Sequence, residues 1–257
     1  MPWRETGDPY RIAISEVMLQ QTQVDRVRPK YAAFLAAFPD FAALARAPLP
    51  EVLAAWQGLG YNRRALALSR LARTVIAEHG GRLPREPEAL RRLPGIGPAT
   101  AASIAAFAFG VPTVFVETNV RRVFLHEFFP GRPGVSDAEL LPLVARTLDR
   151  RRPREWYHAL MDYGAELART VPNPNRRSAG YARQARFAGS DRQVRGAILR
   201  ALLAGGAATE ARLGREVGAE PERLGRLLAA LEAEGFVTRA GRRVALDPGA
   251  PQREGGA

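Results

Sequence analysis

Leu93-Pro94-Gly95-Ile96-Gly97-Pro98 is the stretch that decides the fold. It lies between two helical patterns of apolar residues, over 87–93 and 98–109. Its two glycines allow the backbone to turn tightly, and Pro98 suits the first turn of the following helix. Because the N–H groups at the start of that helix can hold a phosphate, the stretch predicts a helix-hairpin-helix. A turn of Gly and Pro can join any two helices, so this pattern alone is only moderately specific.

Helical spacing of apolar residues continues through most of the chain. Between Pro9 and about Leu167 it is interrupted by Pro and Gly, and no alternation with a period of two is sustained. This pattern predicts an all-α fold of many short helices. The expected helices cover 10–22, 24–37, 50–56, 62–78, 87–93, 98–109, 119–129, 137–150 and 154–168, and only 113–116 is expected to be extended.

A break rich in Pro, Asn and Arg follows at 171–189 and indicates a linker. Beyond it we expect three helices and a hairpin, at 191–204, 209–217, 221–234 and 236–246. Three helices and a basic hairpin are typical of a winged helix, which lays a helix in a DNA groove and the hairpin on the backbone. The hairpin arginines that would contact the backbone are Arg239, Arg242 and Arg243. A protein-docking or merely solubilising module fits the pattern nearly as well.

The chain of 257 residues, 46% of them hydrophobic, is long enough to build more than one core. The expected parts are a helix-hairpin-helix domain over 1–170, a basic linker over 171–189, a winged-helix-like domain over 190–246 and a disordered tail over 247–257. No apolar run approaches the roughly 20 residues that span a bilayer, and the first residues lack a signal-peptide core. We therefore expect a cytoplasmic protein of bacterial or archaeal type, with no membrane partner.

The net charge of +12 and the pI near 11.1 suit a polyanionic partner, because arginines that face phosphates release counterions. Lys30 is the only lysine, and the abundance of Arg, Ala, Gly and Pro is also what GC-rich coding produces. Charge alone therefore favours nucleic acid only modestly. Without cysteine, thiolate nucleophiles, zinc fingers and cysteine-ligated iron–sulfur clusters are excluded. The three histidines have no ligand spacing, so we expect no metal and no cofactor; they are His79, His126 and His158.

Two carboxylates occupy informative positions. Glu16 has Ile12 and Leu19 at i−4 and i+3 of a helix, so it emerges from a largely apolar face. Burial there would raise its pKa and keep a proton available near neutrality, whereas the plain alternative is a solvated glutamate. Glu117 follows the extended stretch and precedes a helix, where a carboxylate commonly stabilises the N-terminus. Because Glu is a poorer N-cap than Thr, we expect Thr118 to cap the helix and leave Glu117 free.

Six motifs occur in order along the first two thirds or so of the chain. They are Pro2-Trp3-Arg4, Ser15-Glu16-Val17-Met18-Leu19-Gln20-Gln21-Thr22-Gln23-Val24, Gly58-Leu59-Gly60-Tyr61, Leu93-Pro94-Gly95-Ile96-Gly97, Asn119-Val120-Arg121-Arg122-Val123 and Met161-Asp162-Tyr163-Gly164-Ala165. Together they resemble the endonuclease III superfamily of helix-hairpin-helix DNA glycosylases, and the string around Glu16 is specific to its adenine-removing MutY branch.

The resemblance implies two helical lobes and a role for each matching residue. Glu16 would be the general acid that protonates a base flipped out of the duplex. The residues that would line the base pocket are Trp3, Arg4, Ala99 and Asp162. Gln21 and Tyr61 would fill or wedge the vacated stack, and Thr22 and Leu59 would lie near the opposite base. Gly95, Ile96 and Gly97 would clamp a phosphate, and Thr100 and Asn119 would complete the DNA contacts.

Two positions in this site depart from the family pattern. The family's catalytic aspartate precedes the Asn-Val-x-Arg-Val motif, and here that position is Glu117. A carboxylate there stabilises the positive sugar, traps it covalently or orients water, and the extra methylene signals shifted geometry, slow chemistry or none. We expect a catalytic role. Ala99 stands where bifunctional relatives carry a Schiff-base lysine, and Lys30 is predicted elsewhere, so a monofunctional hydrolase is expected.

Further departures concern the scaffold. The family normally carries four cysteines for a [4Fe–4S] cluster, but Ala168 stands at the first such position and 173–177 replaces the loop, so the cluster is expected to be absent. Nearby arginines would supply backbone contacts or form a solvated linker; they are Arg169, Arg176, Arg177, Arg183 and Arg186. The family's MutT-like domain, which checks for oxidised guanine, is also expected to be absent, with the winged-helix-like domain in its place. An upstream helix common in the family is expected to be absent or replaced by the C-terminal domain.

The resulting prediction is a monofunctional DNA glycosylase of base excision repair. It would act as a monomer on double-stranded DNA with a mispaired or damaged base, with adenine opposite G or 8-oxoguanine as first choice, and would be associated with the nucleoid when bound. The first alternative removes uracil, thymine or hypoxanthine from a mismatch. The second is a catalytically silent duplex-DNA-binding protein. A purely structural or interaction module is remote, because it explains neither a phosphate hairpin nor two positioned carboxylates.

Overall fold

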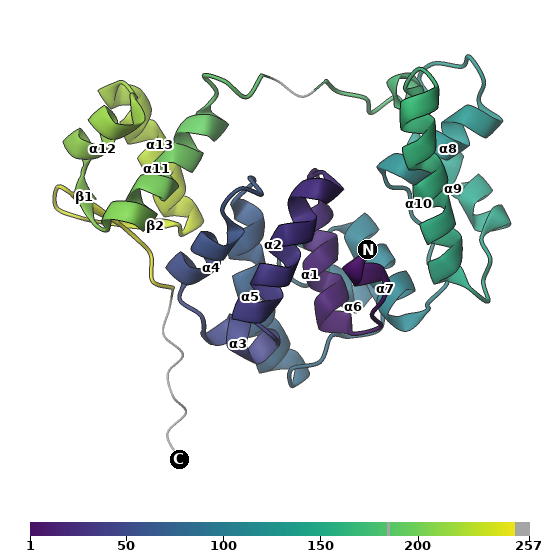
Figure 1. The fold of residues 1–257 in the computed structure, drawn as a ribbon, viewed down its shortest axis with the longest axis horizontal. Helices are drawn as coiled ribbons and strands as arrows, with labels where there is room; N and C mark the ends of the chain where they lie inside the picture. Colours follow the sequence, from purple (N-terminus) through teal and green to yellow (C-terminus); the bar gives the residue numbers. More distant parts are fainter. Residues whose placement is uncertain (184–185, 250–257) are drawn as a thin grey trace. The chain divides into compact units, whose positions relative to one another are not determined.

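The structure is a computed structural model that describes residues 1–183 and 186–249. Residues 184–185 of the predicted linker and 250–257 of the predicted tail lie outside the described residues. The chain forms two compact units, whose elements are labelled in Figure 1. The first unit comprises residues 1–17 and 83–183, and the second comprises 18–82 and 186–249. Each unit therefore contains part of 1–170, and the predicted domain boundaries stay a prediction.

The first unit is helical throughout. Its elements are η1 (Pro2–Arg4), α1 (Pro9–Leu19, whose last two residues belong to the second unit), α6 (Pro87–Arg91), α7 (Pro98–Phe109), α8 (Thr118–Phe128), α9 (Asp137–Thr147), α10 (Pro153–Thr170) and η2 (Pro174–Arg177). Most of these helices lie close to the predicted ranges, because Pro or Gly stands near many of their ends. Helices α8 and α10 pack side by side, as Figure 1 shows, over a core of Phe, Val and Leu side chains.

A buried tyrosine holds the segment 113–116. The rings of Phe115 and Tyr157 stack with their centroids 4.0 Å apart. The Tyr157 hydroxyl donates to the carbonyl oxygen of Thr113 at 2.9 Å and accepts from the N–H of Phe115 at 3.1 Å. One side chain thus satisfies backbone groups that a neighbouring strand would otherwise pair. The segment has no regular secondary structure, so its extended conformation stays a prediction, and it leads directly to Glu117.

The second unit begins with a helical part and ends with a mixed module. The helical part contains α2 (Val24–Ala37), α3 (Phe41–Arg46), α4 (Leu49–Trp56) and α5 (Arg63–His79). Helix α3 was not predicted, because its six residues are too few for a periodic pattern. The available signal was Asp40, whose side chain caps the helix by accepting from the N–H of Ala43 at 2.7 Å.

The C-terminal module, residues 190–246, has the predicted helices and hairpin. Its elements are α11 (Asp191–Gly205), β1 (Ala208–Thr209), α12 (Glu210–Val217), α13 (Pro221–Glu234), β2 (Val237–Ala240) and β3 (Arg243–Leu246). The antiparallel sheet has the order β1-β3-β2, and the short strand β1 was not predicted. Strand β1 is only two residues long, and its partners lie 34 and 36 positions away along the chain. The assignment as a winged helix stays a prediction.

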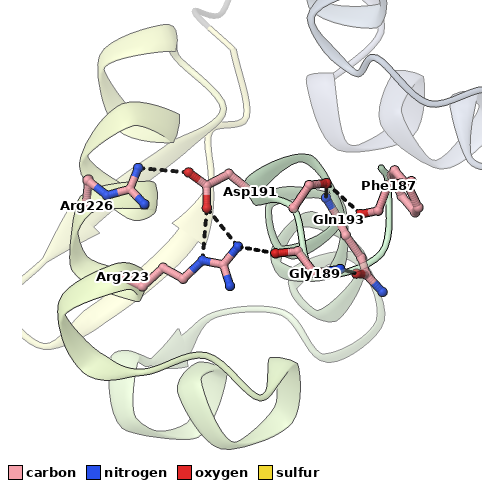
Figure 2. Close-up of polar contacts among 7 residues, drawn as sticks. Phe187, Gly189, Asp191, Gln193, Arg223 and Arg226 are labelled. Carbon is pink, nitrogen blue, oxygen red and sulfur yellow. Dashed lines mark hydrogen bonds and ion pairs between the residues drawn. The ribbon is translucent and has the colours of Figure 1, made fainter. Parts of the chain in front are cut away.

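Ion pairs join the first helix of this module, α11, to α13. Figure 2 shows the Asp191 carboxylate of α11 between Arg223 and Arg226 of α13. Arg223 Nε donates to Asp191 Oδ1 and Arg226 Nη1 donates to Asp191 Oδ2, each at 2.9 Å. Arg223 also donates to the carbonyl oxygen of Gly189 at 2.7 Å. The stretch 189–191 is therefore tied to α13. In the part of the chain that the structure describes, no helix is both long and apolar enough to cross a membrane.

One hairpin arginine that was expected to contact the DNA backbone is engaged within the module, so its DNA contact stays a prediction. Arg239 pairs with Glu210 at 3.2 Å and lies 3.9 Å from Glu232. The period of two along β2 turns this side chain toward the acidic residues of the module's own helices rather than toward solvent. Arg242 and Arg243 are exposed at the turn of the hairpin, so they remain the arginines that a wing could offer to a backbone.

Candidate active site

Glu16 lies on α1 among buried apolar side chains of the first unit. Its Oε2 accepts a hydrogen bond of 2.6 Å from the hydroxyl of Ser103 on α7. Burial is the main cause that raises the pKa of Glu16 to about 7; the Ser103 hydrogen bond opposes this rise, and the charge of Glu117 adds to it. The carboxyl group therefore carries a proton in a large fraction of molecules at neutral pH, as a general acid requires. The alternative of a solvated glutamate does not hold.

Ser103 was not singled out from the sequence. Its hydroxyl lies 2.6 Å from Glu16 Oε2 and 3.0 Å from the carbonyl oxygen of Thr100. A hydroxyl donates one hydrogen and accepts through its lone pairs. Ser103 can therefore donate to the ionised Glu16 carboxylate, or accept from the protonated carboxyl group while it donates to Thr100. The side chain accommodates both protonation states of Glu16.

Glu117 is the N-cap of α8, so the expectation that Thr118 caps this helix is wrong. Its Oε1 accepts from the N–H of Asn119 at 2.7 Å and of Val120 at 2.8 Å. The longer glutamate side chain reaches both donors because residue 117 has an extended backbone. Burial raises the pKa of Glu117, while the two backbone hydrogen bonds and the charges of Arg121 and Arg122 oppose the rise. The carboxyl group is thus anchored rather than free, and its ionised form is held by N–H donors.

The first turn of α8 packs directly on α10. A Cβ added at Gly164 would lie 2.6 Å from the carbonyl oxygen of Asn119 and 2.6 Å from its Cβ, so only glycine fits. Arg122 Nη1 donates to Asn119 Oδ1 at 2.7 Å and to the carbonyl oxygen of Gly164 at 2.6 Å. Asn119, predicted to contact DNA, is therefore engaged within the protein. These contacts fix the position of the turn that carries Glu117.

The segment at the place of the family's cluster loop is a packed 3₁₀ helix, η2. The buried side chain of Asn175 donates to the carbonyl oxygen of Thr118 at 3.0 Å, and Arg177 Nη2 donates to the carbonyl oxygen of Leu125 at 2.6 Å. A solvated linker is therefore the wrong description of 174–177. The donor set does not fit an iron–sulfur cluster, because the chain has no cysteine and this loop presents an amide and a guanidinium that bond to α8.

The predicted base-pocket residues are partly brought together. Arg4 Nη1 donates to both carboxylate oxygens of Asp162 at 2.8 Å, and Trp3 beside it is buried with 7% of its surface exposed. Burial, with the charges of Arg4 and Arg154, lowers the pKa of His158 to about 4, so this imidazole is neutral. Ala99 is exposed in the first turn of α7, where nothing links it to the Arg4 pair.

The hairpin has the predicted geometry. Gly95 has φ +78°, a left-handed conformation that favours glycine, and the buried Ile96 anchors the turn to the core. The first hydrogen bond within α7 runs from the N–H of Ala101 to the carbonyl oxygen of Gly97 at 2.9 Å. The earlier N–H groups of the turn point along the helix axis, with Thr100 next to them. This is a helix N-terminus suited to an anion.

The remaining predicted DNA contacts lie in the second unit. Gln21 and Tyr61 have φ +53° and +47°, both in the left-handed region that side chains rarely adopt. Tyr61 is exposed, with 38% of its surface accessible, as a wedge requires. Thr22 accepts a hydrogen bond of 2.9 Å from Arg64. The Leu59 side chain is buried, with 3% exposed, and its carbonyl oxygen accepts from Arg64 at 3.2 Å, so its contact with the opposite base stays a prediction.

A hairpin whose helix N-terminus suits an anion, together with a protonatable carboxyl group and an anchored one, is typical of a helix-hairpin-helix enzyme that acts on nucleic acid. Residues 14–139 match the HhH-GPD superfamily base excision DNA repair proteins. Adenine DNA glycosylase of Mycolicibacterium smegmatis is 38% identical over 218 residues, which cover 77% of this chain and 74% of that protein. Adenine DNA glycosylase of Mycobacterium tuberculosis is 35% identical over 264 residues, which cover 93% of this chain and 86% of that protein.

A solved structure of a thermostable thymine-DNA glycosylase is also similar, with a TM-score of 0.59 and 30% identity over 68% of this chain and 82% of that one. The chain belongs to the HhH-GPD superfamily of base excision DNA repair proteins. The predicted fold and the prediction of a base excision DNA glycosylase are thereby confirmed. The individual roles of the site residues stay predictions.

Four residues that the structure places in these networks were missed. They are Ser103, Arg122, Asn175 and Arg64. Ser103 and Asn175 meet their partners across 87 and 57 positions of sequence, and Arg122 and Arg64 resemble the other arginines of a basic chain. Only Arg122 carried a signal, because it lies inside the Asn-Val-Arg-Arg-Val motif.

Proposed function

We propose that this DNA glycosylase hydrolyses the N-glycosidic bond of an adenine that is flipped out of duplex DNA opposite guanine or 8-oxoguanine. The observation that carries the proposal is Glu16, half-buried on α1, hydrogen-bonded to Ser103 and with its pKa raised to about 7. Adenine is a poor leaving group until a ring nitrogen is protonated, and a carboxyl group that holds its proton at neutral pH supplies that step. The names of the two actinobacterial relatives support adenine as the base.

The reaction would proceed with each carboxyl group in one role. Glu16 gives its proton to the base, the bond from the sugar carbon to the base nitrogen breaks, and the electron pair leaves with the neutral base. The Glu117 carboxylate, held by two backbone N–H groups, stabilises the positive charge that develops on the sugar. Water then adds to the sugar carbon, and its proton restores the acid. The products are the free base and an abasic site.

Strand cleavage through a Schiff base is not part of the proposal. Lys30, the only lysine, lies on α2 in the second unit, and Ala99 occupies the first turn of α7. An amine that attacks the sugar is therefore not available from the hairpin helix. We propose a monofunctional, monomeric enzyme that needs no iron–sulfur cluster, since η2 carries no thiolate.

The test is a single-turnover incubation of the full chain with duplexes that carry A, U, T, hypoxanthine or 8-oxoguanine in defined pairs. Alkali then reveals abasic sites. We expect product from A opposite G or 8-oxoguanine, only after alkali, and loss of product in the Glu16→Gln and Glu117→Gln variants. Strands cut without alkali would rule out the monofunctional mechanism. Binding without product from any duplex would favour the catalytically silent binder.

A second candidate is removal of thymine or uracil from a mismatch. The likeness to the thermostable thymine-DNA glycosylase favours it, because that structure is 30% identical and covers 68% of this chain. The same panel of duplexes decides between the two candidates. Product from T or U opposite G, with none from A, would replace adenine as the substrate and leave the roles of Glu16 and Glu117 to be measured again.

A further inference from the structure

The α1–α2 turn, residues 20–23, and the α4–α5 connection, residues 57–62, share one partner in the second unit. We propose that Arg64 is a positioning residue that holds these two loops in one fixed arrangement, so that Gln21 and Tyr61 enter the DNA stack together. The proposal rests on the proposed function, because it assumes that a base leaves the stack. It adds a residue outside the motifs to the machinery of base flipping.

The guanidinium of Arg64 reaches both loops. Nη1 donates to the carbonyl oxygens of Met18 at 2.8 Å and Gln20 at 2.7 Å. Nη2 donates to Thr22 Oγ1 at 2.9 Å and to the carbonyl oxygens of Gly60 at 3.1 Å and Leu59 at 3.2 Å. Three acceptors belong to the end of α1 and its turn, and two belong to the α4–α5 connection. One side chain therefore fixes the distance between the loops.

The position of Arg64 makes these bonds strong and specific. Only 9% of its surface is exposed, so water does not compete for its donors. Its guanidinium carbon lies 5.2 Å from the ring centroid of Trp56 and 5.5 Å from that of Tyr61, within range of cation–π attraction. Burial lowers the pKa of Arg64 to about 10, which leaves the side chain protonated at neutral pH.

Each loop also carries backbone strain at the residue predicted to meet DNA. Gln21 and Tyr61 are the two non-glycine residues with positive φ in the part of the chain that the structure describes, and one lies in each loop. Such conformations persist where the surroundings determine them. Arg64 bonds to the residues on either side of Gln21 and to the residue before Tyr61. It is placed to hold both strained residues in the orientation that a wedge needs.

A lysine cannot replace this arrangement. Its ammonium is a single point with three donors, whereas the planar guanidinium offers a rigid fork that spans two loops. Arg64→Lys therefore keeps the charge and removes the fork. Because a misplacement of about 1 Å in positioning groups can cost on the order of 100-fold in rate, we expect at least about a 10-fold loss in the single-turnover rate constant at saturating duplex.

The experiment compares the wild-type chain with Arg64→Lys, with Thr22→Val as a milder variant, and with Arg200→Lys as a matched control at an exposed arginine of α11. Hydrogen–deuterium exchange is measured on the free protein for peptides that cover the two loops. Fluorescence of 2-aminopurine at the target position reports base flipping, and thermal unfolding reports stability. The rate constant and the duplex Kd are measured separately.

We expect Arg64→Lys to speed exchange in both loop peptides, to lower the 2-aminopurine signal and to reduce the rate constant more than it weakens binding. Thr22→Val should speed exchange only in the peptide that covers the α1–α2 turn. Arg200→Lys should leave exchange unchanged in both loop peptides. Unchanged exchange in Arg64→Lys, or loss of activity explained by a lower unfolding temperature alone, would overturn the proposal. Hydrogen–deuterium exchange is measured without a substrate, so it tests the role of Arg64 by itself. A wild-type chain without glycosylase activity would therefore contradict the proposed function, while the exchange data would still test whether Arg64 holds the two loops.

Discussion

The acidity of Glu16 depends on one hydroxyl group. Burial raises its pKa to about 7, and the Ser103 hydrogen bond lowers it. The sequence predicted the direction of this shift, because Ile12 and Leu19 flank Glu16 on one helix face. It could not predict Ser103, which lies 87 positions away on α7. Local periodicity reports which face is buried, but it carries no information about which polar group that face meets.

The pH dependence of the single-turnover rate should follow Glu16. The acid acts in its protonated form, so the rate should fall as pH rises through about 7. Ser103→Ala removes a hydrogen bond that favours the ionised carboxylate, so the pKa of Glu16 should rise and the alkaline limb should move to higher pH. Rate profiles from pH 5 to 9 check both outcomes.

Ser69→Ala is the matched control for this measurement, because the hydroxyl of this buried serine in the second unit has no hydrogen-bond partner in the described part of the chain. Ser69→Ala should leave the alkaline limb of the rate profile at the same pH as in the wild-type chain. An alkaline limb that stays at the same pH in Ser103→Ala would show that Glu16 is not the group that titrates.

At the scale of elements, the contact between α8 and α10 decides where Glu117 stands. The predicted ranges of both helices agree with the structure to within about two residues, and Pro marks the start of α10 and follows closely after the end of α8. The capping of α8 was predicted wrongly, because preferences of isolated N-caps rank Glu low, while here the extended backbone at 117 aims its side chain at two N–H groups. The packed helix η2 was missed for a related reason: its hydrogen bonds to α8 are long-range.

Gly164→Ala should separate these two helices. The new methyl group would lie 2.6 Å from the carbonyl oxygen of Asn119, and backbone on both sides prevents an easy shift. We expect a loss of about 2–3 kcal/mol in the free energy of unfolding, from overpacking, together with a lower rate constant. Denaturant unfolding and single-turnover kinetics check the two effects.

Gly225→Ala on α13 provides the matched comparison, since nothing lies within 4 Å of its added Cβ. This change should stabilise the chain by about 0.5–1 kcal/mol, because alanine is the better helix former. Equal effects of the two substitutions would mean that the Gly164 contact does not constrain α8.

At the scale of the whole molecule, the second unit is built from two segments that are far apart in the sequence. Residues 18–82 and 186–249 form one unit although about 100 residues separate them in sequence. Sequence patterns predicted most of the helices and the hairpin, but not this grouping, because it involves contacts between residues far apart in the sequence. Glu234 on α13 accepts from Arg63 on α5 at 2.7 and 2.8 Å, across 171 positions, and from Arg195 at 2.7 Å.

Glu234→Ala should loosen the C-terminal module from α5. Three arginines meet at this residue, since Arg70 also donates to its carbonyl oxygen at 2.8 Å. Because the Glu234 side chain is only 20% exposed, its pairs with arginine are stronger than surface ones, and we expect a loss of about 1–2 kcal/mol in unfolding free energy. Urea denaturation measures this loss.

Glu88→Ala removes an exposed pair with Arg91 and should cost less than about 0.5 kcal/mol. Exchange in peptides of α5 and α13 should rise in Glu234→Ala and stay unchanged in Glu88→Ala. Similar losses in the two variants would mean that Glu234 is an ordinary surface residue.

The close approach at Gly164 also limits how this gene can vary. Every other amino acid has a Cβ, so any missense change at this codon places an atom against the backbone of α8. At most positions of a protein some other amino acids are tolerated, whereas at position 164 none is expected to be. In a library of random variants selected for repair in living cells, codon 164 should therefore be depleted of every missense change, conservative or not, while codon 225 on α13 should remain diverse.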